Sequence, residues 1–166
     1  IGLWGYDATP ADPFVLNHRN FPTATMLGDA EMVLGALVGG PGTAVIGCLG
    51  GAQVDRQGNI NSTTLVPDGG PFLVGSGGGN DVASTAAECV VVATLTAART
   101  PERCAYVTSP GRTVSALVTD LGILAKHEAG GDLVLAAVPA GEEPLPERIE
   151  QARAACGWDL AVASDV

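Results

Sequence analysis

Hydrophobic positions in this 166-residue chain occur in short, nearly continuous runs separated by polar and glycine-rich segments. The runs at 44–49 and 89–95 are apolar at almost every position, as expected of strands that are covered on both faces. Two further runs, at 72–75 and 104–108, also predict short strands. No apolar run reaches the roughly 18 residues that a membrane-spanning helix requires. The pattern therefore favours a sheet-containing fold and no membrane span.

Two helices and a hairpin complete the predicted arrangement. Residues 29–37 predict a short helix that ends at a glycine-rich stretch, and residues 144–156 predict the last helix. Residues 116–126 and 132–138 flank a Gly-Gly pair and predict an antiparallel hairpin. We therefore expect an α/β fold: an open, mostly parallel sheet flanked by helices, with a C-terminal antiparallel hairpin, in a single domain over 1–166.

A glycine-rich loop is the most informative local feature. Four glycines fall within five positions, after an apolar strand-like run and before a helix-compatible segment; the whole stretch is Gly75-Ser76-Gly77-Gly78-Gly79-Asn80-Asp81. Glycines let backbone N–H groups approach a ligand closely, and a helix N-terminus favours an anion or a developing oxyanion. The alternative is a tight turn that only joins a strand to a helix.

Better-known glycine motifs do not fit this loop. Asn80 stands where a dinucleotide-binding fingerprint needs a third Gly or Ala, and no Lys-Ser or Lys-Thr pair follows the glycines as in a phosphate-binding loop. Val74 stands where a nucleophile elbow around Ser76 would need its first glycine. The loop suits acyl or phosphate oxygens in general and identifies no nucleotide.

A second polar stretch follows the predicted strand at 44–49 and includes Gln53, Asp55, Gly58 and Asn59. Polar residues directly after a buried strand lie at the carboxyl edge of a sheet, where open α/β folds bind ligands. The same residues also read as an ordinary turn, in which Gly58 supplies the permissive conformation. Gln53 and Asn59 are therefore either ligand-binding amides or stabilisers of the turn.

Charge limits the choice of partners. The formal net charge is −10, from 18 acidic and 8 basic residues, which argues against nucleic acid as a ligand. Four widely spaced cysteines include no C-x-x-C pair, and two of them, Cys48 and Cys89, lie in apolar runs, so we expect buried thiols in a cytoplasmic protein. Only two histidines are present, so we expect no metal site.

Taken together, the two motifs resemble the β-subunit half of family I coenzyme A transferases, such as the glutaconate CoA-transferase β subunit and the C-terminal half of succinyl-CoA:3-oxoacid CoA-transferase. The likeness is carried by Gly-Ala-Gln-Val-Asp-Arg-x-Gly-Asn-x-Asn-Ser, then by Gly-Ser-Gly-Gly-x-Asn-Asp. It continues through 117–124 and 130–135 and through the Cys-Gly-Trp-Asp-Leu-Ala-Val ending at 156–162. The resemblance covers nearly the whole chain in order, and it implies the CoA-transferase type of fold.

The resemblance implies a ping-pong transfer in which a glutamate carries CoA as a glutamyl thioester. By position, Gly77 and Gly78 match the oxyanion-stabilising glycines of the family. Candidate substrate-binding residues are Gln53, Asn59, Gly75, Asn80 and Asp81. The expected substrates are an acyl-CoA and a carboxylic acid, with no permanently bound cofactor. The expected partner is an α-type subunit or fused half within an oligomer.

Other functions remain open at this point. A hydrolase or decarboxylase of CoA thioesters could share the fold, and a non-catalytic structural subunit could share the motifs. In the family the nucleophile belongs to a Glu-x-Gly element about eighty residues before the glycine loop, which falls at or before Ile1. We therefore expect the chain to lack its N-terminal portion and its own nucleophile, because Asp7, Asp12 and Glu31 do not match that element. The proline-bearing segment 1–22 predicts irregular structure.

Overall fold

A computed structural model describes residues 2–4, 17–66, 70–128, 130–164 and 166. Its main sheet has five strands in the order β3-β6-β7-β8-β9. Their bounds are Ile46–Gly50 for β3, Glu88–Val92 for β6, Val114–Val118 for β7, Ile123–Ala125 for β8 and Val134–Ala137 for β9. The pairs β3–β6 and β6–β7 are parallel, and the pairs β7–β8 and β8–β9 are antiparallel. The expected α/β fold with a C-terminal antiparallel hairpin is confirmed.

The described residues also form four helical segments and two small sheets. The α-helices are α1 (Gly79–Thr85) and α2 (Leu145–Ala155), η1 (His18–Thr23) is a 3-10 helix, and η2 (Glu31–Val38) is a π-helix. One two-stranded antiparallel sheet pairs β1 (Gly2–Trp4) with β2 (Met26–Gly28), and the other pairs β4 (Gln53–Val54) with β5 (Ile60–Asn61). Among the described residues, no helix is long and apolar enough to cross a bilayer.

The core lies against one face of the main sheet. Leu117, Leu124 and Leu135 are fully buried there, one from each of three neighbouring strands. Helix α1 lies so close to the sheet that a Cβ atom at Gly47 would be 2.4 Å from Cγ1 of Val82. Since no side chain could occupy that gap, glycine in β3 is what permits this packing.

The opposite face of the sheet is more exposed at its margin. Ile46 is 61% exposed and Val92 is 59% exposed, and the strand register places Cys48 on the same face. Cys48 is therefore an exposed free thiol, whereas Cys89 is buried. The expectation of burial is confirmed for Cys89 and wrong for Cys48, because alternate residues of β3 point to opposite faces.

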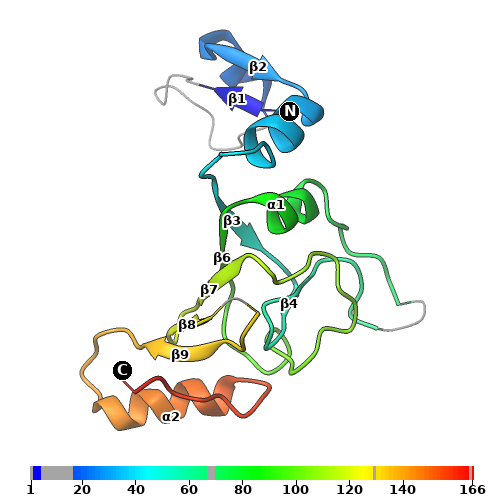
Figure 1. Ribbon diagram of the computed structural model, residues 1–166. Coiled ribbons are helices and arrows are strands. Elements are labelled where there is room, and N and C mark those ends of the chain that lie inside the picture. Colours follow the sequence, from blue (N-terminus) through cyan, green and yellow to red (C-terminus); the bar gives the residue numbers. More distant parts are fainter. Residues whose placement is uncertain (1, 5–16, 67–69, 129, 165) are drawn as a thin grey trace.

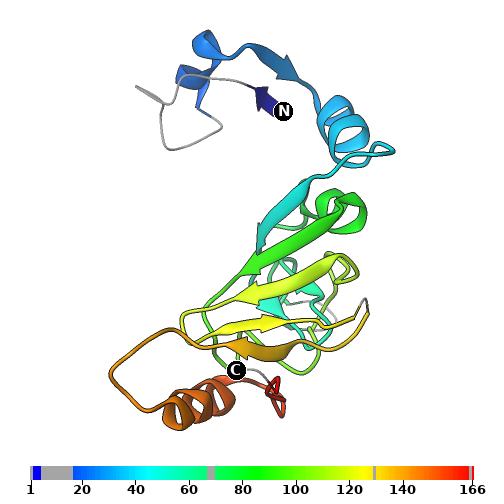
Figure 2. The ribbon, with the colours of Figure 1, turned by 60° about the vertical axis from the view of Figure 1, so that its left-hand side comes forward.

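The molecule is elongated (Figures 1 and 2). The N-terminal elements β1, β2, η1 and η2 lie at one end, and α2 lies at the other end beside β9. Helix η2 contacts α1, and the side chain of Leu34 lies 3.1 Å from the position of a Cβ at Gly78. Segment 1–22 was expected to be irregular, but its described part contains β1 and most of η1.

Several predicted elements match the structure. Helix η2 overlaps the predicted helix at 29–37, strands β3 and β6 overlap the predicted strands at 44–49 and 89–95, and α2 lies within the predicted helix at 144–156. The predicted hairpin is present between β8 and β9. Its first arm, 116–126, is itself folded into β7 and β8 at a turn in which Thr119 N donates to Gly122 O over 2.9 Å.

Two predicted strands are wrong. Residues 72–75 have no regular secondary structure: Leu73 N donates to Thr63 O over 2.8 Å and Val74 N to Ser62 O over 3.1 Å, so they lie along a loop and do not join a sheet. Phe72 is 71% exposed and Val74 is 79% exposed, which no covered strand would allow. Residues 104–108 form a loop whose N–H groups are bound by side chains and by Ile60 O.

Candidate functional site: a glycine loop and the segments that hold it

The glycine loop adopts backbone angles that require glycine. Gly75 has a φ of +72° and Gly77 has a φ of +49°, both in the left-handed region that other residues rarely enter. Gly78 is the N-cap of α1 with a φ of −81°, and Gly79 N donates to Ser76 O over 2.8 Å. The predicted order of a glycine turn followed by a helix N-terminus is confirmed.

Two adjacent backbone donors of this loop are available to a ligand. Within the described part of the chain, the N–H groups of Gly77 and Gly78 have no hydrogen-bond acceptor. Gly77 is exposed and Gly78 is half-buried, so a ligand can approach both. A Cβ at Gly77 would meet no atom within 4 Å, which places open space beside this residue. Unpaired N–H groups at a helix start suit a carboxylate, a phosphate or an oxyanion.

Hydrogen bonds hold the loop on both sides. On the upstream side, Val74 N and Gly75 N both donate to Ser62 O, over 3.1 Å and 2.9 Å. On the downstream side, Asn80 Nδ2 donates to Thr108 O over 2.7 Å. Ser84 Oγ donates to Asn80 Oδ1 over 3.3 Å, so both ends of the Asn80 amide bind the protein itself. The Asp81 side chain is exposed in the first turn of α1.

The second motif is a tight turn built around the Asp55 carboxylate. Asp55 is 4% exposed, and its Oδ1 accepts from Gln57 N and Asn59 N, both over 3.0 Å. Its Oδ2 accepts from Asn59 Nδ2 over 3.1 Å and from Cys104 N over 3.3 Å. Gly58 has a φ of +76°, as expected from the turn interpretation. This buried acid is satisfied by four donors and has a structural role here.

The amides of Gln53 and Asn59 also bind neighbouring segments of the protein. Gln53 Oε1 accepts from Asn61 Nδ2 over 2.8 Å and from Ala105 N over 3.2 Å, while its Nε2 donates to Ala98 O over 3.3 Å. Asn59 Oδ1 accepts from Gly111 N over 2.9 Å. These contacts agree with the turn-stabilising interpretation, and direct substrate contact by Gln53 or Asn59 stays a prediction.

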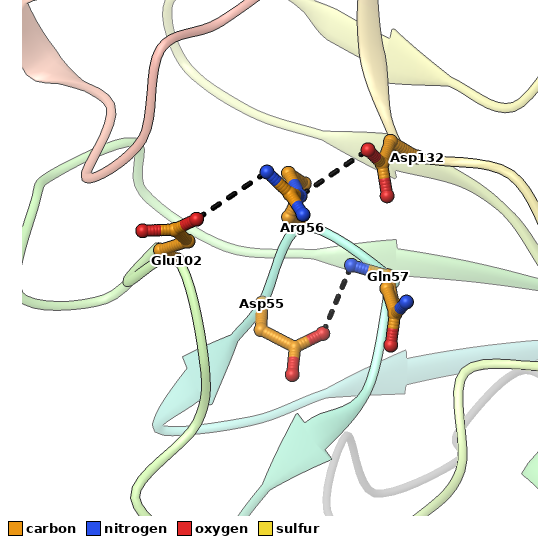
Figure 3. Close-up of polar contacts among 5 residues, drawn as sticks. All are labelled: Asp55, Arg56, Gln57, Glu102 and Asp132. Atoms are coloured by element: carbon orange, nitrogen blue, oxygen red, sulfur yellow. Dashed lines mark hydrogen bonds and ion pairs between the residues drawn. The ribbon is translucent and has the colours of Figure 1, made fainter.

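The arginine of this motif is engaged in two ion pairs. Arg56 lies between Glu102 and Asp132, at 3.3 Å and 3.2 Å, while Asp55 points back into its own turn toward Gln57 (Figure 3). The Arg56 side chain is 42% exposed, so each pair contributes less than about 1 kcal/mol. The Arg56 guanidinium is therefore already paired with two carboxylates and is not free to bind a polyanionic ligand.

Burial shifts the pKa of two groups near this turn. Burial, together with the Asp55 charge, raises the pKa of the Cys104 thiol to about 12, and Cys104 Sγ donates to Asn59 O over 3.3 Å. Burial lowers the pKa of the Lys126 ammonium, which donates to Gly111 O over 2.7 Å. Both groups therefore support the turn, and a neutral thiol at Cys104 is a poor nucleophile.

A separate cavity of about 420 Å³ lies between the β7–β8 turn and the start of α2. Its polar lining includes Asp120, Glu142, Glu143, Arg148 and Gln151, and none of the glycine-loop residues. Asp120 Oδ1 accepts from Leu95 N over 2.8 Å, so this carboxylate binds the backbone that follows β6. Among the described residues, no cluster of three or more His, Cys, Asp or Glu side chains could hold a metal ion.

Thr108 is the residue that sequence reasoning missed. It binds Asn80 at the downstream end of the glycine loop and Ser62, whose carbonyl binds the upstream end, yet the sequence placed it at the end of a strand that does not exist. It lies 28 positions from Asn80 and 46 positions from Ser62, so no local pattern indicates either contact.

No family model matches the chain. A curated relative, the B-type subunit of 3-oxoadipate CoA-transferase from Pseudomonas knackmussii, is 28% identical over 138 residues, which cover 73% of this chain and 51% of the relative. The crystal structure of glutaconate coenzyme A-transferase from Acidaminococcus fermentans is 30% identical with a TM-score of 0.59, covering 70% of this chain and 50% of that one. The structure of a cysteine variant of the decarboxylase AibA/AibB is similar in fold, with a TM-score of 0.74 at 17% identity over 92% of this chain and 62% of that one.

The chain thus spans about half the length of these transferase relatives. The two transferase matches confirm its resemblance to family I CoA transferases of the β-subunit type. The decarboxylase likeness shows a shared fold alone.

Proposed function

We propose that this chain, which resembles the β-type half of family I CoA transferases, contributes the oxyanion-binding side of a CoA-transfer site. The observation that supports the proposal best is the pair of unpaired N–H groups at Gly77 and Gly78, at the start of α1. Similarity to two transferases adds the reaction class. The whole protein would exchange CoA between an acyl-CoA and a carboxylic acid, with no permanently bound cofactor.

In the proposed reaction a glutamate carboxylate attacks the thioester carbonyl and expels CoA thiolate, which leaves a mixed anhydride. The thiolate then attacks the glutamyl carbonyl and releases the first carboxylic acid, which leaves a glutamyl-CoA thioester. A second carboxylate takes the CoA by the reverse steps and regenerates the glutamate. Each tetrahedral intermediate carries an oxyanion, and a backbone donor to it contributes about 3 kcal/mol.

The proposal places the nucleophilic glutamate outside these 166 residues, on another segment or on an α-type partner. Glu128 also precedes an x-Gly pair, but it follows the glycine loop along the chain, whereas the family element precedes it. Cations for the CoA phosphates would come from the α-type half, because this chain carries a net charge of −10. Gly75, Asn80 and Asp81 are proposed to border the substrate, together with Gln53 and Asn59.

A second candidate is a CoA-thioester hydrolase or decarboxylase, which the fold likeness to AibA/AibB favours. A third is a subunit that only shapes the site of its partner. All three share the fold, so the products formed by the complete protein separate them.

The test is to assemble the full-length protein with its α-type half and incubate it with acyl-CoA and a panel of carboxylic acids. Transfer predicts new acyl-CoA without net loss of CoA thioester. Free CoA would instead indicate hydrolysis, and released CO₂ would indicate decarboxylation. Borohydride trapping with acyl-CoA should label no carboxylate between residues 7 and 165. A label on a carboxylate in that range would contradict the placement of the nucleophile.

A further inference from the structure

The segment 104–111 links the two sequence motifs. Cys104 N donates to Asp55 Oδ2 over 3.3 Å, and Ala105 N donates to Gln53 Oε1 over 3.2 Å. Gly111 N donates to Asn59 Oδ1 over 2.9 Å. Thus the side chains of Gln53, Asp55 and Asn59, all in the second motif, each accept from a backbone N–H group of this one segment.

Close packing supplements these hydrogen bonds at the end of the segment. A Cβ at Gly111 would lie 2.3 Å from Gln57 O and 2.6 Å from Asn59 N. Both of those atoms belong to the backbone and cannot swing aside. The backbone of the segment at Gly111 therefore packs directly against the backbone of the Asp55 turn.

In the same segment, Thr108 reaches the upstream side of the glycine loop. Thr108 is 8% exposed, and its Oγ1 accepts from Ser62 N over 2.8 Å and contacts Thr63 Oγ1 over 2.8 Å. The carbonyl of Ser62 in turn accepts from Val74 N and Gly75 N. The Thr108 hydroxyl thus positions Ser62, whose carbonyl binds the residues at the start of the glycine loop.

Thr108 also reaches the downstream side of the loop. Its carbonyl accepts from Asn80 Nδ2 over 2.7 Å, in the first turn of α1. Thr108 N donates to Ile60 O over 2.9 Å, which ties the residue itself to β5. The loop between Gly75 and Asn80 is therefore held at its two ends by one residue.

We propose that Thr108 is a positioning residue for the oxyanion-binding loop, and that the Gln53, Asp55 and Asn59 side chains act on the loop through it. The inference rests on the proposed function, because it takes the N–H groups of Gly77 and Gly78 to be the donors that bind the oxyanion. Oxyanion stabilisation depends on preorganised donors, and a misplacement of about 1 Å can reduce turnover by about a hundredfold. Thr108 supplies that preorganisation by hydrogen bonds that hold both ends of the loop.

Thr108→Val tests the proposal because it keeps the side-chain shape and removes the hydroxyl. In the complete enzyme we expect kcat to fall by about tenfold to a hundredfold with KM changed much less. Exchange of the Val74, Gly75 and Gly79 amides should rise by a few-fold to about tenfold in hydrogen-exchange measurements. Thr108→Ser keeps the hydroxyl, so its kcat and its amide exchange rates should be close to those of the unaltered protein.

Thr113→Val is the matched control. Thr113 Oγ1 donates to Ala83 O over 2.6 Å, so it also binds α1 through a hydroxyl but at the far end from the loop. It should leave kcat and loop exchange unchanged. If Thr108→Val does not fold, Asn80→Ala removes the downstream bond and should give the same two effects.

The two measurements separate the failure of this inference from that of the proposed function. Faster loop exchange with no CoA transfer in any variant would uphold Thr108 as the loop's anchor and overturn the transferase assignment. A folded Thr108→Val with unchanged exchange and unchanged kcat would overturn the inference. It would also be overturned if Thr113→Val had equal effects.

Discussion

Replacing Asp55 by asparagine is expected to destabilise the fold strongly, even though the change is isosteric. The carboxylate is 4% exposed and accepts four hydrogen bonds from Gln57, Asn59 and Cys104. An amide retains one acceptor oxygen, which can serve the two backbone donors now bound to Oδ1. Its NH₂ group would then face Asn59 Nδ2 and Cys104 N, two donors with no acceptor.

Each unsatisfied buried donor costs about 1–3 kcal/mol. With partial relaxation of the turn, we expect Asp55→Asn to lower the free energy of unfolding by about 2–4 kcal/mol. Urea denaturation of the full chain measures this, and at an m-value of about 2 kcal/mol/M the midpoint should fall by about 1–2 M.

Asp132→Asn is the control for the same chemical change at the surface. Asp132 lies 3.2 Å from Arg56, but its side chain is 46% exposed, so its loss should cost less than about 1 kcal/mol. The reasoning is refuted if Asp55→Asn costs no more than Asp132→Asn.

Two further predictions concern the same turn. Burial raises the pKa of Cys104 to about 12, so its thiol stays protonated at pH 8, and iodoacetamide should alkylate the exposed Cys48 first. Mass spectrometry of the labelled peptides checks this order, and faster labelling of Cys104 would contradict it. Gly111→Ala should cost about 2 kcal/mol or more in urea denaturation, because its Cβ would lie 2.3 Å from Gln57 O. Gly35→Ala, whose Cβ meets nothing within 4 Å, should cost nothing, and equal losses would contradict the packing argument.

The sequence predicts elements best where a hydrophobic run coincides with a strand of the main sheet, although the expected cover on both faces is wrong at Ile46 and Val92, which are 61% and 59% exposed. The apolar runs at 44–49 and 89–95 mark β3 and β6, which pair in parallel, and the predicted helix at 144–156 contains α2. The runs at 72–75 and 104–108 are equally apolar but form no strand. Their N–H groups bind carbonyls and side chains of residues 53–63, and apolar character does not reveal which groups a backbone will bind.

The same limit applies to the candidate site. Positive φ at Gly75 and Gly77 could be expected, because glycines in a turn before a helix commonly adopt the left-handed conformation that other residues rarely enter. The partners of Gln53 and Asn80 could not, since Ala105 and Thr108 are 52 and 28 positions away. Single-sequence patterns report local geometry, whereas these hydrogen bonds depend on how distant segments fold together.

Removal of one backbone donor, by comparing Gly78→Pro with Gly78→Ala, tests the central claim most directly. Gly78 has a φ of −81°, which a proline ring accepts, and within the described residues its N–H has no acceptor to lose. The preceding residue, Gly77, has no Cβ, which removes one of the two groups that a following proline ring crowds, the other being its N–H. Both variants place a Cβ 3.1 Å from Leu34 Cδ1, so they share any steric effect.

The measurement is kcat for CoA transfer by the complete enzyme carrying each variant. If the Gly78 N–H stabilises the oxyanion, Gly78→Pro should be about 10²- to 10³-fold slower than Gly78→Ala, with equal folding by circular dichroism. If the folded proline variant turns over within a few-fold of the alanine variant, the glycine loop does not bind the oxyanion through this group.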